Sequence, residues 1–201
     1  MMDDGASLGL CIIMDQNDYG TIKLEADKLG FMTQCGKFDK ITKNPRGYTF
    51  NMMLKINTKL GGINHALISR LPEGEPVKKV FQCPPASITW LFDEPCMVVG
   101  IDVSHGEPSS SSESVAAVVG SMDGSCAQYA AHLSVQTARQ EICSGLDDGI
   151  RDLLNTFRAI NGVFPTTMIC YRDGVSEGQF SMVTTQELEK IQSGIVDDFI
   201  V

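Results

Sequence analysis

Several features that mark membrane, secreted and disulfide-bonded proteins are missing from this sequence. Its apolar runs are all shorter than the roughly 20 residues that a membrane-spanning helix needs, so we expect no membrane association. The first residues, Met1–Asp4, are acidic where a signal peptide would carry basic residues. Seven cysteines are present, an odd number, and no two form a Cys-x-x-Cys pair. These absences favour a cytoplasmic protein with reduced thiols, with the nucleus as the alternative location.

The sequence also lacks the motifs of two common classes of catalytic site. Ser176 stands in Val-Ser-Glu-Gly, which is not the nucleophile elbow of a serine hydrolase. Histidine is scarce, and neither His65 nor His132 has a partner at the spacing of metal ligands. Serine hydrolysis and histidine-based metal binding at these positions are therefore disfavoured.

Positive charge is scarce overall but is unevenly distributed. The formal net charge is −9, which argues against a general nucleic-acid binder. Residues 1–80 nevertheless carry 11 Lys and Arg against 9 Asp and Glu, whereas residues 81–201 carry 5 against 16. The first part could hold phosphate and the second could hold cations. The alternative is that the acidic part is only a solvated surface.

The apolar pattern divides the chain into two units joined by a connector. In the first unit we predict a strand at Leu8–Met14 and helices at Tyr19–Leu29 and Thr49–Leu60. Proline and charged residues are concentrated after Leu71, which is typical of a boundary between units. The predicted organisation is a first unit at residues 1–75, a connector at residues 76–95 and a second unit at residues 96–201.

The second unit reads as three strands, a helix, a strand and a helix. The predicted strands are Cys96–Val103, Ser114–Met122, Ala127–Val135 and Thr167–Tyr171. Asp123-Gly124 between two apolar runs indicates a hairpin. Apolar residues at helical spacing between Leu146 and Ile160 indicate one amphipathic helix, and a last helix is predicted from about Glu177. This order predicts an α/β fold, a mixed sheet with flanking helices as in ribonuclease H.

Two aspartates stand where predicted strands end. Asp102 closes the first strand of the second unit, and Asp173 closes the fourth. Mg²⁺ prefers carboxylate oxygens, and two divalent ions can activate water and stabilise the leaving oxygen of a phosphodiester. Glu141, on the loop after the third strand, could complete such a site. The alternative is that these three residues are capping or surface acids.

Four segments of the second unit resemble the Piwi domain of Argonaute proteins. They occur in the family's order and span residues 97–190 or so. The segments are Gly100-Ile101-Asp102-Val103-Ser104-His105, Ser114–Asp123, Val135–Ile142 and Tyr171-Arg172-Asp173-Gly174-Val175-Ser176-Glu177-Gly178-Gln179-Phe180. The resemblance implies a ribonuclease H-like fold, Asp102 and Asp173 as catalytic ligands of Mg²⁺ or Mn²⁺, and Glu141 as the residue that completes the catalytic site.

The resemblance also implies a residue that this chain is not expected to supply. The family's fourth catalytic residue, a His or Asp, lies well beyond the 28 residues that follow Asp173. For the same reason we expect His105 to be structural rather than that fourth residue. The interpretation is a truncated gene product or fragment whose active site is incomplete.

The first unit resembles a partial Argonaute MID domain, the Rossmann-like lobe that grips the 5′ phosphate of a guide RNA. The similarity lies in the Met53–Gly62 helix and in Thr33-Gln34-Cys35, which resembles the family's pocket loop. Lysines four residues apart share one face of a helix, although such pairs are often only a solvated surface. By the resemblance, the residues that bind the RNA 5′ phosphate are Tyr19, Lys23, Gln34, Lys55 and Lys59.

Two functions follow from these resemblances. The first is a metal-dependent endoribonuclease that holds a small guide RNA and cleaves complementary target RNA in gene silencing, in company with silencing-complex proteins. The second is a non-catalytic remnant that only binds 5′-phosphorylated small RNA.

Overall fold

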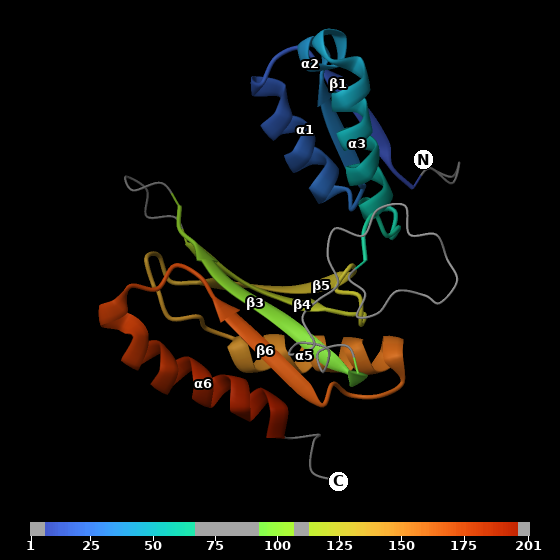
Figure 1. Ribbon diagram of the computed structural model, residues 1–201. Coiled ribbons are helices and arrows are strands. Elements are labelled where there is room, and N and C mark those ends of the chain that lie inside the picture. Colours follow the sequence, from blue (N-terminus) through green and yellow to red (C-terminus); the bar gives the residue numbers. More distant parts are fainter. Residues whose placement is uncertain (1–6, 67–92, 107–112, 197–201) are drawn as a thin grey trace. The chain divides into compact units, whose positions relative to one another are not determined.

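The computed structural model describes residues 7–66, 93–106 and 113–196 and divides into two compact units, residues 1–65 and residues 66–201 (Figure 1). The predicted connector, residues 76–95, lies outside the described residues except for residues 93–95. No helix in the described ranges is long and apolar enough to cross a membrane.

The first unit is a strand–helix–strand unit followed by two helices. Its elements are β1 (Gly9–Ile13), α1 (Asn17–Lys28), β2 (Thr33–Lys37), α2 (Phe38–Lys43) and α3 (Pro45–Lys59). β1 and β2 pair in parallel with α1 as the crossover, as in part of a Rossmann fold. The segment expected as a pocket loop is thus strand β2. Asn44 begins α3 by accepting a hydrogen bond from the Gly47 amide at 3.1 Å, and Pro45 occupies the first turn. The assignment of this unit as a MID lobe stays a prediction.

The second unit contains the predicted mixed sheet. Its elements are β3 (Cys96–Ser104), β4 (Ser114–Ser121), β5 (Tyr129–Gln136), α5 (Leu146–Asn161), β6 (Thr167–Arg172), η2 (Glu177–Gln179) and α6 (Phe180–Val196). The strand order is β5-β4-β3-β6, antiparallel except for the parallel pair β3 and β6. The expected α/β architecture with flanking helices is confirmed.

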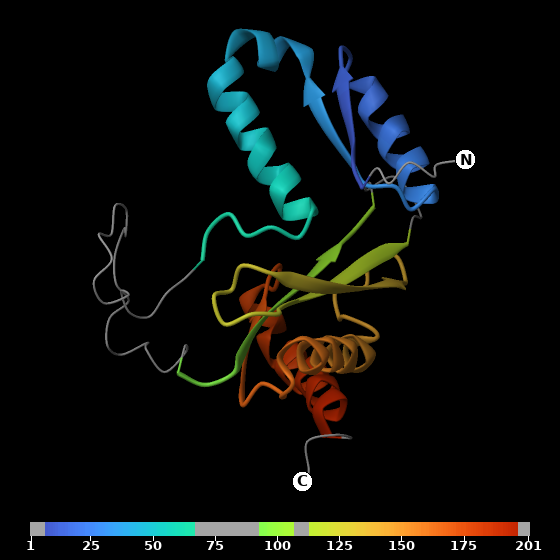
Figure 2. The same cartoon turned by 90° about the vertical axis from the view of Figure 1, so that its right-hand side faces the viewer.

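Both long helices of the second unit cover the same face of the sheet (Figures 1 and 2). Alternate residues of β3, namely Met97, Val99 and Ile101, are 0–3% exposed because successive side chains of a strand point to opposite faces. They pack in one core with Leu153 of α5 and Ile191 of α6. The opposite face carries Asp102, so the core leaves the end of β3 available for chemistry.

The predicted Asp-Gly hairpin joins β4 to β5. Asp123 Oδ1 accepts hydrogen bonds from the backbone amides of Ala127 at 2.9 Å and Gln128 at 2.7 Å. Burial raises the pKa of Asp123, but the hydrogen bonds from Ser125, Gln128 and Ala127 outweigh it and hold the pKa below its ordinary value. The carboxylate of Asp123 therefore organises this turn.

The Leu153→Ala variant should lose about 2–5 kcal/mol of unfolding free energy. Leu153 is 2% exposed and faces Gly120 across the core, so its removal leaves a cavity under the sheet. Ile160→Ala, on the same helix but 58% exposed, is the matched control and should lose far less. Urea unfolding followed by circular dichroism measures both, and equal losses would contradict the proposed packing.

Candidate functional site

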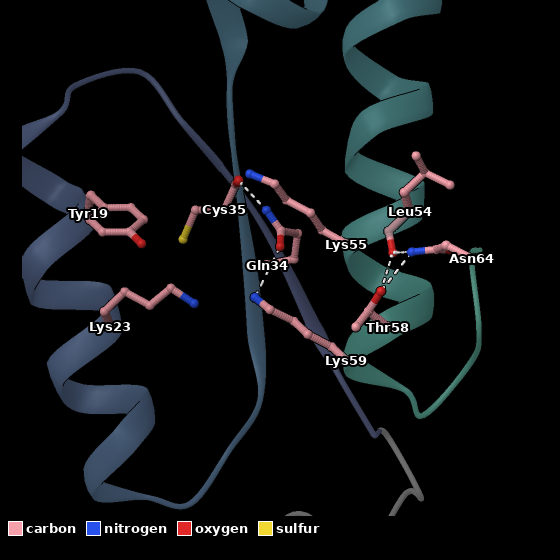
Figure 3. A pocket seen from close by; sticks show the side chains of 9 residues that line it. All are labelled: Tyr19, Lys23, Gln34, Cys35, Leu54, Lys55, Thr58, Lys59 and Asn64. Carbon is pink, nitrogen blue, oxygen red and sulfur yellow. Dashed lines mark hydrogen bonds between the residues drawn. The ribbon is translucent and has the colours of Figure 1, made fainter. Parts of the chain in front are cut away.

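A pocket of about 460 Å³ lies between α1, β2 and α3 in the first unit (Figure 3). Helix α1 contributes Tyr19 and Lys23, which are one turn apart, and helix α3 contributes Lys55 and Lys59 with the same spacing. Gln34 enters from β2. All of the residues predicted to bind a 5′ phosphate therefore line one cavity, although their role stays a prediction.

Two lysine side chains from opposite walls of this pocket converge on one backbone carbonyl. Lys23 Nζ donates to the Thr33 carbonyl at 2.7 Å and to Thr33 Oγ1 at 3.0 Å. Lys59 Nζ donates to the same carbonyl at 2.6 Å and to Gln34 Oε1 at 3.0 Å. A neutral oxygen cannot compensate two positive charges, so the pair is suited to an anion.

The pKa of Lys59 is lowered below its ordinary value by its burial and, further, by the nearby ammonium group of Lys23. The pocket lining, as far as the structure describes it, includes no carboxylate. An anion placed between the two ammonium groups would relieve their repulsion and favour the charged form of Lys59.

Four further residues line the pocket and were given no binding role in the sequence analysis: Cys35, Leu54, Thr58 and Asn64. Asn64 donates to the Leu54 carbonyl at 2.8 Å and to Thr58 Oγ1 at 2.7 Å, which closes the side of the pocket beside α3. The chain reaches this position through Gly61, whose φ of +84° is easily adopted only by glycine. The Gly-Gly pair after the helix was the available signal. Cys35, which belongs to the segment expected as the pocket loop, lies next to Gln34 on β2.

In the second unit, Asp102 lies in β3, two residues before the strand ends, and Asp173 directly follows the parallel neighbouring strand β6. Ile101 of β3 is paired with Arg172 of β6, and the Asp173 amide donates to the Ile101 carbonyl at 3.1 Å. Both aspartates are exposed. A Cβ placed on Gly174 would lie 3.9 Å from Asp102 Oδ1, so the turn after Asp173 runs beside the other carboxylate. The strand pairing thus brings together two acids that are far apart in sequence.

Glu141 is held by a histidine. Glu141 Oε1 lies 3.2 Å from His105 Nε2, and His105 Nδ1 lies 2.8 Å from the hydroxyl of the buried Ser114. The same hydroxyl accepts a hydrogen bond from the Arg139 amide at 3.0 Å. His105 was expected to be structural, and here it links β4 to the carboxylate of Glu141. The role of Glu141 itself stays a prediction.

The two aspartates suit Mg²⁺ or Mn²⁺ by the chemistry of their donor atoms. Mg²⁺ is usually bound by one or two carboxylates, with waters and substrate phosphates as its other ligands. Asp102 and Asp173 supply such carboxylates at one exposed edge of the sheet. Within residues 7–66, 93–106 and 113–196, no three His, Cys, Asp or Glu side chains converge closely enough to hold a metal by themselves.

Comparisons with known proteins agree on one family. The Piwi domain family model matches residues 9–197. The Caenorhabditis elegans protein tag-76 is 35% identical over 201 residues, a match that covers 94% of this chain and 18% of that protein. The chain therefore spans less than a fifth of the length of this curated relative.

The solved structures that match are also Argonaute proteins, and each match covers 94% of this chain. Kluyveromyces polysporus Argonaute with a guide RNA has a TM-score of 0.77 at 28% identity, with 20% of that chain covered. The C-terminal lobe of a budding yeast Argonaute has a TM-score of 0.76 at 27% identity, with 35% covered. The MID and PIWI domains of the N. crassa Argonaute QDE-2 have a TM-score of 0.72 at 27% identity, with 51% covered.

Proposed function

Because the chain belongs to the Piwi domain family of Argonaute proteins, we propose that its first unit binds the 5′-phosphorylated end of a small guide RNA. The observation that carries this proposal is the convergence of Lys23 and Lys59 on the Thr33 carbonyl. A phosphate oxygen is a stronger acceptor than that carbonyl and brings the negative charge that the pocket lacks.

Each predicted pocket residue has a task in this proposal. Lys23, Lys55 and Lys59 neutralise the phosphate, and the Gln34 side chain orients Lys59. Tyr19 is 43% exposed at the same pocket, so its ring is available to stack on the first base. Stacking on an aromatic ring accepts any base, which suits a protein whose specificity resides in the guide.

We propose further that the second unit cleaves target RNA paired with the guide. Asp102 and Asp173 would hold Mg²⁺ or Mn²⁺, which supplies an activated water and neutralises charge on the leaving oxygen. Glu141 would complete the site from its loop, where His105 orients its carboxylate. Silencing-complex proteins are the expected partners, and the cytoplasm or nucleus is the expected location.

A second candidate function is guide binding without cleavage. One observation favours it: the part of the chain that the structure describes includes no group of three metal-binding side chains. The two candidates share the pocket of the first unit and differ only in the chemistry of the second. A binding experiment therefore tests their common part first.

The test is to compare 5′-phosphorylated RNA with 5′-hydroxyl RNA of the same sequence. Charge-assisted hydrogen bonds from the lysines should make the phosphorylated form bind about tenfold or more tightly. Fluorescence anisotropy of labelled RNA with the full chain measures both affinities. Equal affinities for the two RNAs would contradict recognition of the phosphate.

A further inference from the structure

Helix α6 carries a buried carboxylate that the proposed cleavage does not use directly. Glu187 is only 2% exposed. Its Oε2 accepts a hydrogen bond from Arg172 Nε at 2.9 Å, and its Oε1 lies 3.3 Å from Arg172 Nη2. The two side chains therefore form a paired, largely buried contact between α6 and the end of β6.

The remaining hydrogen bonds of this pair go to the backbone around the predicted site. Glu187 Oε1 accepts from the Cys143 amide at 2.8 Å. Arg172 Nη2 donates to the Glu141 carbonyl at 2.6 Å, and Arg172 Nη1 donates to the Asp173 carbonyl. The ion pair is thus bonded to the backbone of two of the three predicted acids, Glu141 and Asp173. Another α6 residue, Lys190, donates to the Cys143 carbonyl at 3.1 Å.

This arrangement is difficult to explain by packing alone. Two buried charges lose hydration, and apolar residues of similar size often serve stability equally well. The carboxylate and guanidinium, in contrast, can fix several backbone groups in one geometry. A site whose acids come from different elements requires such fixing, since small displacements of catalytic groups lower rates strongly.

We infer that Glu187 is a positioning residue that, through Arg172 and the Cys143 amide, sets where Glu141 and Asp173 lie. The inference rests on the cleavage proposed above, because positioning matters only if these acids act together. It gives helix α6 a positioning role in the site, although Glu187 itself is buried and is not one of the predicted metal ligands. Outer partners of metal-site residues commonly change metal affinity or activity by about 10–100-fold when they are replaced.

The test uses the full chain with Glu187→Gln, which keeps the shape of the side chain and removes its charge. Hydrogen exchange of the segment 139–144 should accelerate about tenfold or more, while exchange in α5 stays as in the wild type. In Mn²⁺ the kcat for cleavage of a guide–target duplex should fall about 10–100-fold with KM for the target unchanged. Lys190→Met should loosen the same segment without leaving a buried charge unpaired.

Glu189→Gln is the matched control, because Glu189 is an exposed acid on the same helix. It should leave exchange and cleavage unchanged. Unaltered exchange of residues 139–144 in Glu187→Gln, or an equal acceleration in α5, would overturn the inference. Faster exchange of residues 139–144 in Glu187→Gln together with a wild-type kcat would also overturn the inference. If the wild type binds guide but cleaves nothing, the proposed cleavage fails, and the exchange result alone then decides whether Glu187 holds the loop.

Discussion

Replacing Lys59 with methionine should weaken binding of 5′-phosphorylated RNA by about 10–100-fold and leave binding of 5′-hydroxyl RNA nearly unchanged. Methionine keeps the length and apolar stem of the side chain, so the wall of the pocket persists. What is lost is the ammonium group 2.6 Å from the Thr33 carbonyl, one of the two that converge there. Anisotropy titrations of both RNAs with wild type and variant measure the difference.

Lys40→Met is the matched control for this prediction. Lys40 is an exposed lysine of α2 in the same unit and does not line the pocket. A general electrostatic attraction for RNA would weaken equally in both variants and would depend steeply on salt. Equal losses in Lys59→Met and Lys40→Met would therefore contradict a specific phosphate pocket.

The pH dependence gives the same prediction a second readout. Burial and the charge of Lys23 hold the pKa of Lys59 below its ordinary value of 10.5. A lysine is charged below its pKa, so the pocket loses positive charge as the pH rises through this lowered value. As the pH rises, the preference for 5′-phosphorylated RNA should therefore begin to weaken at a lower pH than it would if Lys59 had the ordinary lysine pKa. The Lys59→Met variant should not show this step.

The grouping of the pocket residues on helix faces could be predicted from spacing, whereas their binding roles were implied by the resemblance to Argonaute. Tyr19 and Lys23, like Lys55 and Lys59, are one helical turn apart and so share a face of their helix. The two strands that carry and precede the aspartates were expected to be neighbours from the resemblance to a ribonuclease H-like sheet, although two strands and a helix separate them in sequence. The structure accordingly places Asp102 beside the turn that follows Asp173.

The parts that were missed depend on contacts between distant elements. His105 follows β3 and Glu141 follows β5, which are two strands apart in the sheet, and Glu187 of α6 accepts a hydrogen bond from the Cys143 amide. No periodicity in the sequence marks such buried polar contacts. The start of the last helix was misplaced for a local reason: Ser176 and Gln179 form a capping box on a short 3₁₀ turn, and α6 begins only at Phe180.

Asp102→Asn should lower cleavage of a guide-paired target in Mn²⁺ by at least about 100-fold and leave guide binding unchanged. Asparagine retains an oxygen that can accept the hydrogen bond of 2.8 Å from the Val103 amide, so the end of β3 should keep its conformation. What disappears is the negative charge that a divalent ion requires. A gel assay of a labelled target at several Mn²⁺ concentrations measures the loss.

The double variant Asp102→Asn with Asp173→Asn separates a shared site from independent effects. If both carboxylates hold the same ions, the second replacement should add little to the first, because residues that act as a unit are not additive. Asp148→Asn is the matched control, since Asp148 is an exposed acid of α5 paired with Arg151.

Cleavage that survives Asp102→Asn would refute the metal site. Intact guide binding by a wild type that never cleaves would instead favour the non-catalytic function, because the pocket of the first unit works without either aspartate.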